Sequence, residues 1–348
     1  MIGKSDLANI AQRGWLVHEA EQVEPRAPAG SYALPQEWKE KLTPYPMGPT
    51  MAYEVEDVDL AGAALIGFKD GDVILDQGYY GRLDLWERNW GYFQMARECL
   101  RLPAIEIECA MVLASVWNGN YFHWVLDELP KLEGAEVYTR ETGRRPMIVA
   151  PGRAPGFAIE TLQQSGMPFR LVDDLHLHVK RLVICTARRA EGRIAASAVD
   201  YLRGMTQRVN QWWEPSGTSD RLYITRRGAA TRRVANESRL AEKLLERGFA
   251  ICQLETMSVA EQQQRFAGAE WVIGPHGAGL ANLAWVWSPA ETKVLELVAP
   301  QYSNPCCWMV GEAAGVGRYG YIMGEGVGKE DMTIDLDTLD WMMERMEA

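Results

Sequence analysis

The sequence predicts an α/β protein built from two domains. Short apolar runs typical of buried strands alternate with helical stretches, which indicates βαβ units around a parallel sheet. The chain has 348 residues, enough for about two domains, and the clearest linker is SGTSD at 216–220. We therefore expect a first domain over 1–214, a second over 215–335, and a C-terminal helix over 336–348 that could pack back on the first domain.

The elements of the first half follow from local patterns. Residues 1–60 are rich in proline and polar groups and show little period, so we expect an extended lead-in there. Apolar runs on either side of Asp70-Gly71 predict a hairpin over 63–75. Asn120 is a candidate cap for a helix that bends at Pro130 and continues to about Tyr138. Further strands are expected at 104–114, 147–150, 169–172 and 181–186, and further helices at 158–166 and 195–213.

The second half alternates more regularly. Strands are expected at 221–225, 249–254, 271–274 and 293–298, and helices at 236–248, 258–269 and 279–287. This pattern predicts a doubly wound sheet of at least four strands. Ligands of such sheets bind at the carboxyl ends of the strands, so residues just after the strands are the candidates for function.

Composition and charge exclude several classes of protein. Hydrophobic residues make up 47% and charged residues 24%, which argues against a disordered or fibrous chain. The net charge of −11 argues against a general nucleic-acid binder. Against this acidic total, residues 181–239 contain twelve arginines, no lysines and five acids. A guanidinium fork suits phosphate, so an anionic ligand near this stretch is expected.

The cysteines and the hydropathy pattern indicate a protein of the cytoplasm. None of the six cysteines forms a CxxC pair, so we expect reduced core thiols rather than a disulfide framework or a metal site. No segment has the ~18 continuous apolar residues of a membrane span, and the first residues lack the apolar run of a signal peptide. Peripheral contact with the inner face of the membrane is compatible with these features.

The strongest local motif is WVIGPHGAGLAN at 271–282. A buried strand runs into Gly274, His276, Gly277, Ala278 and Gly279 before a helix begins. Small residues let a backbone approach a ligand closely, and the free N–H groups of a helix start suit a diphosphate. The alternative is a tight strand-to-helix turn in which His276 bonds only to backbone.

Arginines follow the preceding strand in YITRRGAATRRVANE at 223–237. Arg226 and Arg227 stand where the strand ends, and Arg232 and Arg233 precede a capped helix. At least two of the four are expected to be surface charges. Glu296, at the end of KVLELV, could accept hydrogen bonds from ribose hydroxyls, or bond to nearby protein groups instead.

A third motif, NGNYFHWVLDELPKL at 118–132, carries a histidine and a carboxylate. His123 and Asp127 are four residues apart, so they share a helix face and can hydrogen-bond. An imidazole oriented by a carboxylate is a general-base arrangement, whereas the alternative is a pair on the helix surface.

Together the three motifs resemble glycosyltransferase family 61, which includes bacterial capsular-polysaccharide enzymes and eukaryotic O-GlcNAc and xylosyl transferases. The resemblance covers about residues 115–300, and the first hundred residues match no part of it. The matching residues are Asn120, His123 and Trp124; Tyr223 to Arg226; Arg232 or Arg233, Asn236 and Glu237; Gly274, His276, Gly277, Ala278, Leu280 and Asn282; and Glu296.

The resemblance implies a GT-B-like architecture, with two Rossmann-like domains facing across a cleft. It also implies inverting, metal-independent transfer of a sugar from a nucleotide-diphosphate donor, usually a UDP-sugar, to a hydroxyl of a glycan or glycolipid acceptor. The setting would be capsular or surface polysaccharide biosynthesis. No cofactor or metal is expected, since the nucleotide sugar is a co-substrate. His123 would be the base, oriented by Asp127, with the reverse assignment open. The donor-binding residues would be Arg226, Arg232, Asn236, Gly274, His276, Gly277, Ala278, Gly279, Asn282 and Glu296.

Two other functions compete with transfer. The chain could be an inactive nucleotide-sugar-binding or scaffold subunit of a polysaccharide assembly system, which an intact His123 argues against. It could also be a hydrolase or epimerase of nucleotide sugars, but it has no nucleophile elbow and no dinucleotide fingerprint.

Overall fold

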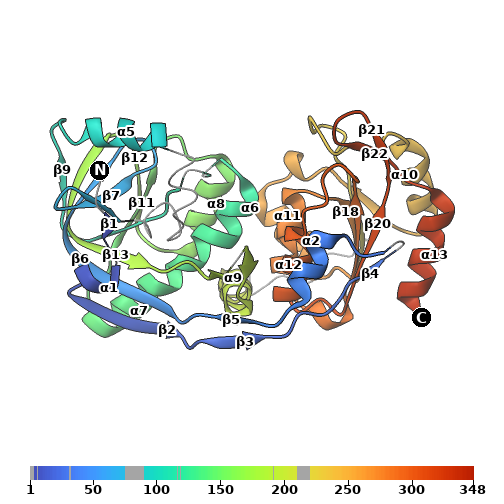
Figure 1. Ribbon diagram of the computed structural model, residues 1–348, viewed down its shortest axis with the longest axis horizontal. Coiled ribbons are helices and arrows are strands. Elements are labelled where there is room, and N and C mark those ends of the chain that lie inside the picture. The colour runs from blue at the N-terminus through green and yellow to red at the C-terminus, as the bar shows by residue number, and fades with distance from the viewer. Residues whose placement is uncertain are drawn as a thin grey trace. The chain divides into compact units, whose positions relative to one another are not determined.

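The computed structural model describes residues 4–5, 7–30, 33–74, 90–115, 117, 119–190, 192–209 and 220–348. The chain divides into two compact units that both mix helices and strands (Figure 1). The first unit comprises Met1–Glu21 and Met47–Arg189, and the second comprises Gln22–Pro46 and Ala190–Ala348. The predicted α/β class is confirmed.

The division differs from the expected boundary at 214/215. The first unit ends at Arg189, and the early segment 22–46 belongs to the second unit. The reason is that β4 (Ala29–Gly30) pairs in parallel with β20 (Arg318–Met323), and Trp38 of α2 (Gln36–Lys39) stacks on Trp308. Apart from Asp220, the predicted linker at 216–220 lies outside the described residues.

The first unit is built on a ten-stranded mixed sheet. Its order is β1-β8-β7-β6-β13-β10-β11-β12, with β2 also paired to β6 and β9 to β13. The strands are β1 (Lys4–Ser5), β2 (Arg13–His18), β6 (Thr50–Ala61), β7 (Ile66–Lys69), β8 (Asp72–Ile74), β9 (Ile105–Ile107), β10 (Ala110–Val112), β11 (Met147–Pro151), β12 (Phe169–Val172) and β13 (His176–Cys185). The helices are α1 (Leu7–Ile10), α5 (Trp90–Cys99), α6 (Tyr121–His123), α7 (Leu132–Thr142) and α8 (Gly156–Ser165).

The expected extended lead-in is wrong for β2 and β6. Strand β6 lies inside the sheet and pairs antiparallel with β13. It buries Val55, Val58 and Leu60, but acidic residues between them give the segment a polar composition. The hairpin is confirmed, because β7 and β8 pair antiparallel across Asp70 and Gly71, which have φ of 52° and 84°.

The second unit contains a six-stranded sheet in the order β17-β16-β18-β19-β20-β4, parallel throughout. In Figure 1, α10 and α13 lie on one side of this sheet, and α11 and α12 lie on the other. The remaining strands of this sheet are β16 (Arg221–Ile224), β17 (Ala250–Cys252), β18 (Trp271–Pro275) and β19 (Lys293–Val298). The helices are α9 (Ala196–Val209), α10 (Glu237–Glu246), α11 (Val259–Ala267), α12 (Cys306–Ala313) and α13 (Leu336–Glu347). Short two-stranded ladders join β3 (Glu21–Val23) to β5 (Tyr45–Met47), β14 (Arg189–Ala190) to β15 (Arg193–Ile194), and β21 (Glu325–Val327) to β22 (Asp331–Thr333).

The C-terminal helix α13 packs on the sheet of its own unit, whereas we expected that it could pack back on the first domain. Its apolar stripe, which includes Leu339 and Met342, is buried in one core cluster with Tyr223, Trp271 and Ile322 of the second unit's sheet. A helix with one apolar stripe must bury it against another element, and α13 buries its stripe in the core of the second unit.

Among the residues that the structure describes, no helix combines the length and the apolar character needed to cross a membrane.

Candidate functional site

The second unit gathers its candidate residues at the carboxyl ends of neighbouring strands. Arg226 follows β16, His276 follows β18, and Cys306 begins α12 after β19. Because these strands are adjacent and parallel, their ends meet at one edge of the sheet, the usual ligand position in such folds.

Arg226 packs against the glycine of the His276 loop. Any side chain on Gly277 would collide with the guanidinium group of Arg226. The guanidinium also donates to the carbonyl oxygen of Thr231, from Nη2 at 3.1 Å and from Nε at 3.3 Å. Burial, followed by the nearby charge of Arg232, lowers the pKa of Arg226. A cation held this way is desolvated and would be stabilised by an anion.

Of the other three arginines, one is partly buried and two are surface groups. Arg232 lies 4.8 Å over the ring of Tyr302, and its buried Nε has no hydrogen-bond partner in the described structure, only an ion-pair contact of 3.9 Å with Glu330. Arg233 binds Asp331 through Nε at 3.1 Å and Nη2 at 2.8 Å.

Arg227 is a surface group like Arg233. Its side chain is 67% exposed, and its Nε lies 3.4 Å from Glu237. Arg226 and Arg232 are therefore the two arginines best placed to meet a ligand at this edge of the sheet.

His276 is buried and held by a carboxylate. Its Nδ1 lies 2.5 Å from Oε1 of Glu296, and the hydroxyl of Tyr319 donates to Oε2 of Glu296 at 2.8 Å. Glu296 alternates along β19 with Leu295 and Leu297, which belong to the core under α10 and α13. Its side chain therefore points to the opposite face of the sheet. Burial alone would lower the pKa of His276, but hydrogen bonds with Cys306 and Glu296 raise it to about 9.

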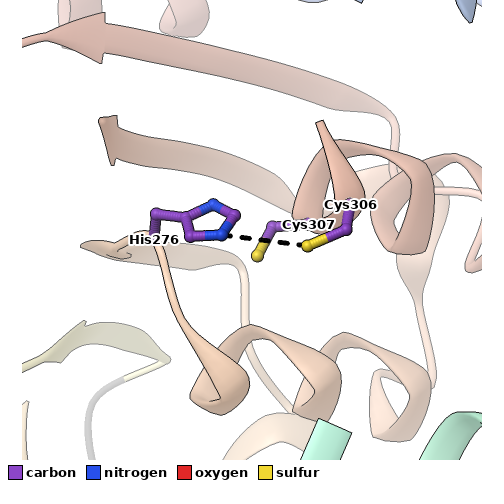
Figure 2. Close-up of side chains that lie close together, drawn as sticks. All are labelled: His276, Cys306 and Cys307. Carbon is purple, nitrogen blue, oxygen red and sulfur yellow. Dashed lines mark hydrogen bonds between the residues drawn. The ribbon is translucent and has the colours of Figure 1, made fainter. Parts of the chain in front are cut away.

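Two cysteines complete this group, and the sequence reasoning missed both. Figure 2 shows the sulfurs of Cys306 and Cys307 close to the imidazole of His276. Sγ of Cys306 lies 3.8 Å from Nε2 of His276, and Sγ of Cys307 donates to the carbonyl oxygen of Gly277 at 3.6 Å. The signal available in the sequence was a cysteine pair soon after the strand that ends near Glu296.

These three side chains are also the residues to consider for a metal ion. Within the described ranges, His276, Cys306 and Cys307 form the single group of three whose ligand atoms all lie within 4.8 Å of one another. The guanidinium of Arg226 packs on the adjacent Gly277. The ring of Tyr302 contacts both the guanidinium of Arg232 and the imidazole of His276. Two cations beside the group favour an anion there over a metal cation.

Several predicted donor-binding residues are engaged by the protein itself. The amide of Asn236 exchanges two hydrogen bonds with the backbone of Ile334, at 2.7 and 3.0 Å. Asn282 is buried and donates to Gln262 and to the carbonyl oxygen of Gly279. Both oxygens of Glu296 are occupied as well, so its predicted contact with ribose would require one of these hydrogen bonds to open.

The glycine-rich turn has a close-packed backbone. A Cβ on Gly274 would lie 2.9 Å from Ile224, and one on Gly279 would lie 2.8 Å from Leu254. The segment Ala278–Trp285 is a 3-10 helix rather than the expected α-helix. Ala278 and Gly279 at its start are partly exposed, so this turn presents backbone toward the surface.

The first unit holds the second candidate centre. Asn120 caps α6 as predicted, since its side chain accepts from the backbone N–H of Phe122 at 2.9 Å. A π-helical turn, Trp124–Glu128, then widens the helix, a distortion often found at functional sites. Nδ1 of His123 lies 2.6 Å from Oδ2 of Asp127, which is the contact that the spacing predicted.

The surroundings of this pair distinguish its two members. The Asp127 side chain is 0% exposed, and Nη1 of Arg189 lies 2.8 Å from each of its oxygens. His123 is 24% exposed, and Trp117 stacks on its ring at 4.7 Å between centroids. Neither Arg189 nor Trp117 could be assigned from the sequence, because stacking and long-range pairing leave no spacing signal.

The two centres can be compared with a known family. A family model described as Glycosyltransferase 61 matches residues 121–295, from the helix that carries His123 to the strand that carries Glu296. No curated protein matches the chain. Because the match spans half of the chain and includes both motif-bearing regions, the chain belongs to glycosyltransferase family 61.

Proposed function

We propose that this glycosyltransferase moves a sugar from a UDP-sugar to a hydroxyl of a glycan acceptor, with inversion at the anomeric carbon and without a catalytic metal. The observation that carries the proposal is the partly exposed imidazole of His123, held by a fully buried carboxylate. Inversion in a single displacement needs one base, and this pair provides one.

His123 takes the proton of the acceptor hydroxyl in this proposal. The hydroxyl oxygen attacks the anomeric carbon, the bond from that carbon to the diphosphate breaks, and UDP leaves with the electron pair. Asp127 is buried and bonded to Arg189, so it is less suited to reach an acceptor. Its role is to orient the ring and stabilise the imidazolium that forms. The geometry thus supports His123 over Asp127 as the base.

The second unit would bind the donor. Arg226, Arg232 and the N–H groups at the start of the 3-10 helix Ala278–Trp285 offer charge and donors to the leaving diphosphate. Guanidinium groups can supply the stabilisation that a metal ion gives in other transferases. Asn236, Asn282 and Glu296 would act by holding this loop in shape, and the two units would correspond to the two domains of a GT-B enzyme.

The biological setting we propose is the assembly of capsular or another surface polysaccharide. It rests on the family and on the chemistry of the acceptor class, a glycan hydroxyl.

A panel of UDP-sugars and acceptors, analysed by mass spectrometry, tests the proposal. UDP release that requires an acceptor, with NMR showing the opposite anomeric configuration in the product, supports inverting transfer. UDP release without acceptor would indicate a hydrolase. Binding without any product would indicate a nucleotide-sugar-binding scaffold, and either of these results would contradict transfer.

A further inference from the structure

Cys306 lies in surroundings that differ from those of an ordinary core thiol. It is the first residue of α12, an eight-residue helix, and it is only partly buried. Its backbone N–H donates to Oδ1 of Asn304 at 2.9 Å, and its Sγ faces Nε2 of His276 at 3.8 Å (Figure 2). The partial positive charge of a helix start and an imidazole partner both favour a thiolate.

His276 is positioned to act as a cationic partner for that sulfur. Glu296 engages Nδ1, so the nitrogen that remains toward Cys306 is Nε2. The hydroxyl of Tyr319 donates to Oε2 of Glu296 and so fixes the position of the carboxylate. A nucleophile paired with a histidine that a third group orients is the arrangement found around activated thiols.

The positive charges near the pair favour a thiolate at Cys306, whereas the negative charge of Glu296 opposes it. Arg226 packs against Gly277 on one side, and Arg232 lies over Tyr302, whose ring is 5.2 Å from that of His276. The carboxylate of Glu296 also faces the pair, and it hydrogen-bonds to the imidazole rather than to the sulfur. Cys307, the remaining neighbour, is fully buried, and burial raises its pKa well above the usual value. It therefore stays a neutral thiol, whose single S–H can donate either to the carbonyl oxygen of Gly277 or to the sulfur of Cys306.

We propose that Cys306 is a covalent modification site, a thiolate held by the imidazolium of His276, that reacts with soft carbon electrophiles. The chemistry is a single displacement. The sulfur of Cys306 forms a bond to the electrophilic carbon, the leaving group departs with its electron pair, and His276 keeps its proton.

The directions of the pKa shifts of the thiols agree with this geometry. Hydrogen bonding from Cys307, opposed by burial and helped by His276, lowers the pKa of Cys306 below the usual range. Burial instead raises the pKa of Cys109, Cys185 and Cys252. Among these thiols Cys306 alone is expected to be largely ionised below neutral pH.

Site-resolved alkylation of the wild-type protein tests the proposal without any substitution. The full chain is treated with iodoacetamide in EDTA between pH 5 and 9, and the rate at each cysteine is measured by peptide mass spectrometry. Cys306 should react first at pH 6, about ten-fold or more faster than the partly exposed Cys99, because an ordinary thiol is almost wholly protonated there. The advantage should shrink toward pH 9, since a low-pKa thiolate is intrinsically less nucleophilic.

Two variants distinguish activation of Cys306 by His276 from simple accessibility of the thiol. His276→Gln should move the half-maximal pH of Cys306 alkylation upward toward about 8.5, the value of a free thiol. His18→Gln, which makes the same change at a histidine of the first unit, should leave Cys306 as the fastest site and so serves as the matched control. A Cys306 that reacts no faster than Cys99 at pH 6 in the wild type would overturn the proposal. The proposal would also be overturned if His276→Gln left the half-maximal pH of Cys306 unchanged while the buried Cys252 of the same unit stayed unreactive, which confirms an intact fold.

Alkylation in the presence of UDP tests whether Cys306 lies at the donor site, and this part of the experiment rests on the proposed function. UDP should slow alkylation of Cys306 but not of Cys99, because the thiol lies beside the proposed diphosphate site. If Cys306 is reactive at pH 6 and UDP gives no protection, the thiolate stands and the donor site is misplaced. If UDP binds but Cys306 is unreactive, the modification site is wrong and the donor site stands.

Discussion

The two candidate centres each hold a histidine bound to a carboxylate, and the surroundings of the two pairs differ. The His123–Asp127 and His276–Glu296 contacts measure 2.6 and 2.5 Å. In the first, Arg189 bonds to the carboxylate and the imidazole is 24% exposed. In the second, Tyr319 bonds to the carboxylate, and the thiol of Cys306 faces a buried imidazole.

The difference shows that a histidine–carboxylate pair does not define a role by itself. An imidazole can exchange a proton with an acceptor only if one ring nitrogen is accessible, which favours His123 as the base. With both nitrogens facing protein groups, His276 is suited to hold a loop and a thiolate. The predictions below test this contrast, from the largest expected effect to the smallest.

His123→Ala should remove most of the transferase activity. Loss of general-base help typically costs roughly 10²–10⁴-fold in rate. The measurement is initial rate of acceptor-dependent UDP release. His18→Ala, which changes a histidine elsewhere in the first unit, is the control and should keep near wild-type activity. Near-normal turnover by His123→Ala would exclude it as the base.

Asp127→Asn should reduce the rate less than His123→Ala does. The amide keeps the shape of the side chain but cannot stabilise the imidazolium as a carboxylate does, and it leaves the charge of Arg189 without its partner. Steady-state rates of both variants, with thermal unfolding to confirm folding, make the comparison. A dead Asp127→Asn beside an active His123→Ala would reverse the two roles.

Arg226→Ala should weaken UDP binding more than Arg227→Ala does. Arg226 is packed into the His276 loop, whereas the Arg227 side chain is 67% exposed beside Glu237. Losing a charged hydrogen bond costs about 1.5–3 kcal/mol, or roughly ten- to hundred-fold in Kd. Calorimetric titration with UDP measures both variants. Equal, small losses would place Arg226 among the surface charges.

Chelation should have no effect on UDP affinity. The proposed donor site uses guanidinium groups and backbone N–H groups in place of a metal ion, so EDTA removes nothing that it needs. A thermal-shift series with UDP, with and without EDTA, tests this expectation. A strict requirement for Mn²⁺ or Mg²⁺ would remove metal independence from the proposed function.

The sequence pattern predicted those features that depend on interactions between residues close together in the chain. The Asn120 cap, the Asp70-Gly71 hairpin and the bond from His123 to Asp127 all depend on residues within a few positions of one another, and all are present in the structure. The alternation of strands and helices likewise gave the parallel sheet of the second unit.

Contacts between distant segments could not be read in the same way. Strand β4 pairs with β20, whose residues lie almost 300 positions later, and the two residues of β4 carry no strand signal of their own. Arg189 meets Asp127 across 62 positions. A carboxylate on the apolar strand β19 needs a partner, and the sequence left open whether ribose hydroxyls or protein groups would bond to Glu296. Only the structure reveals its hydrogen bonds with Tyr319 and His276.

The most direct test of the account is UDP affinity measured in His123→Ala and Arg226→Ala side by side. The proposed base lies in the first unit and the proposed donor site in the second, so substitutions in the two units should affect transfer and UDP binding separately. We expect His123→Ala to bind UDP with wild-type affinity while transfer is lost, and Arg226→Ala to bind UDP about ten-fold or more weakly. A His123→Ala variant that folds normally but loses UDP affinity as severely as Arg226→Ala would contradict this division of roles.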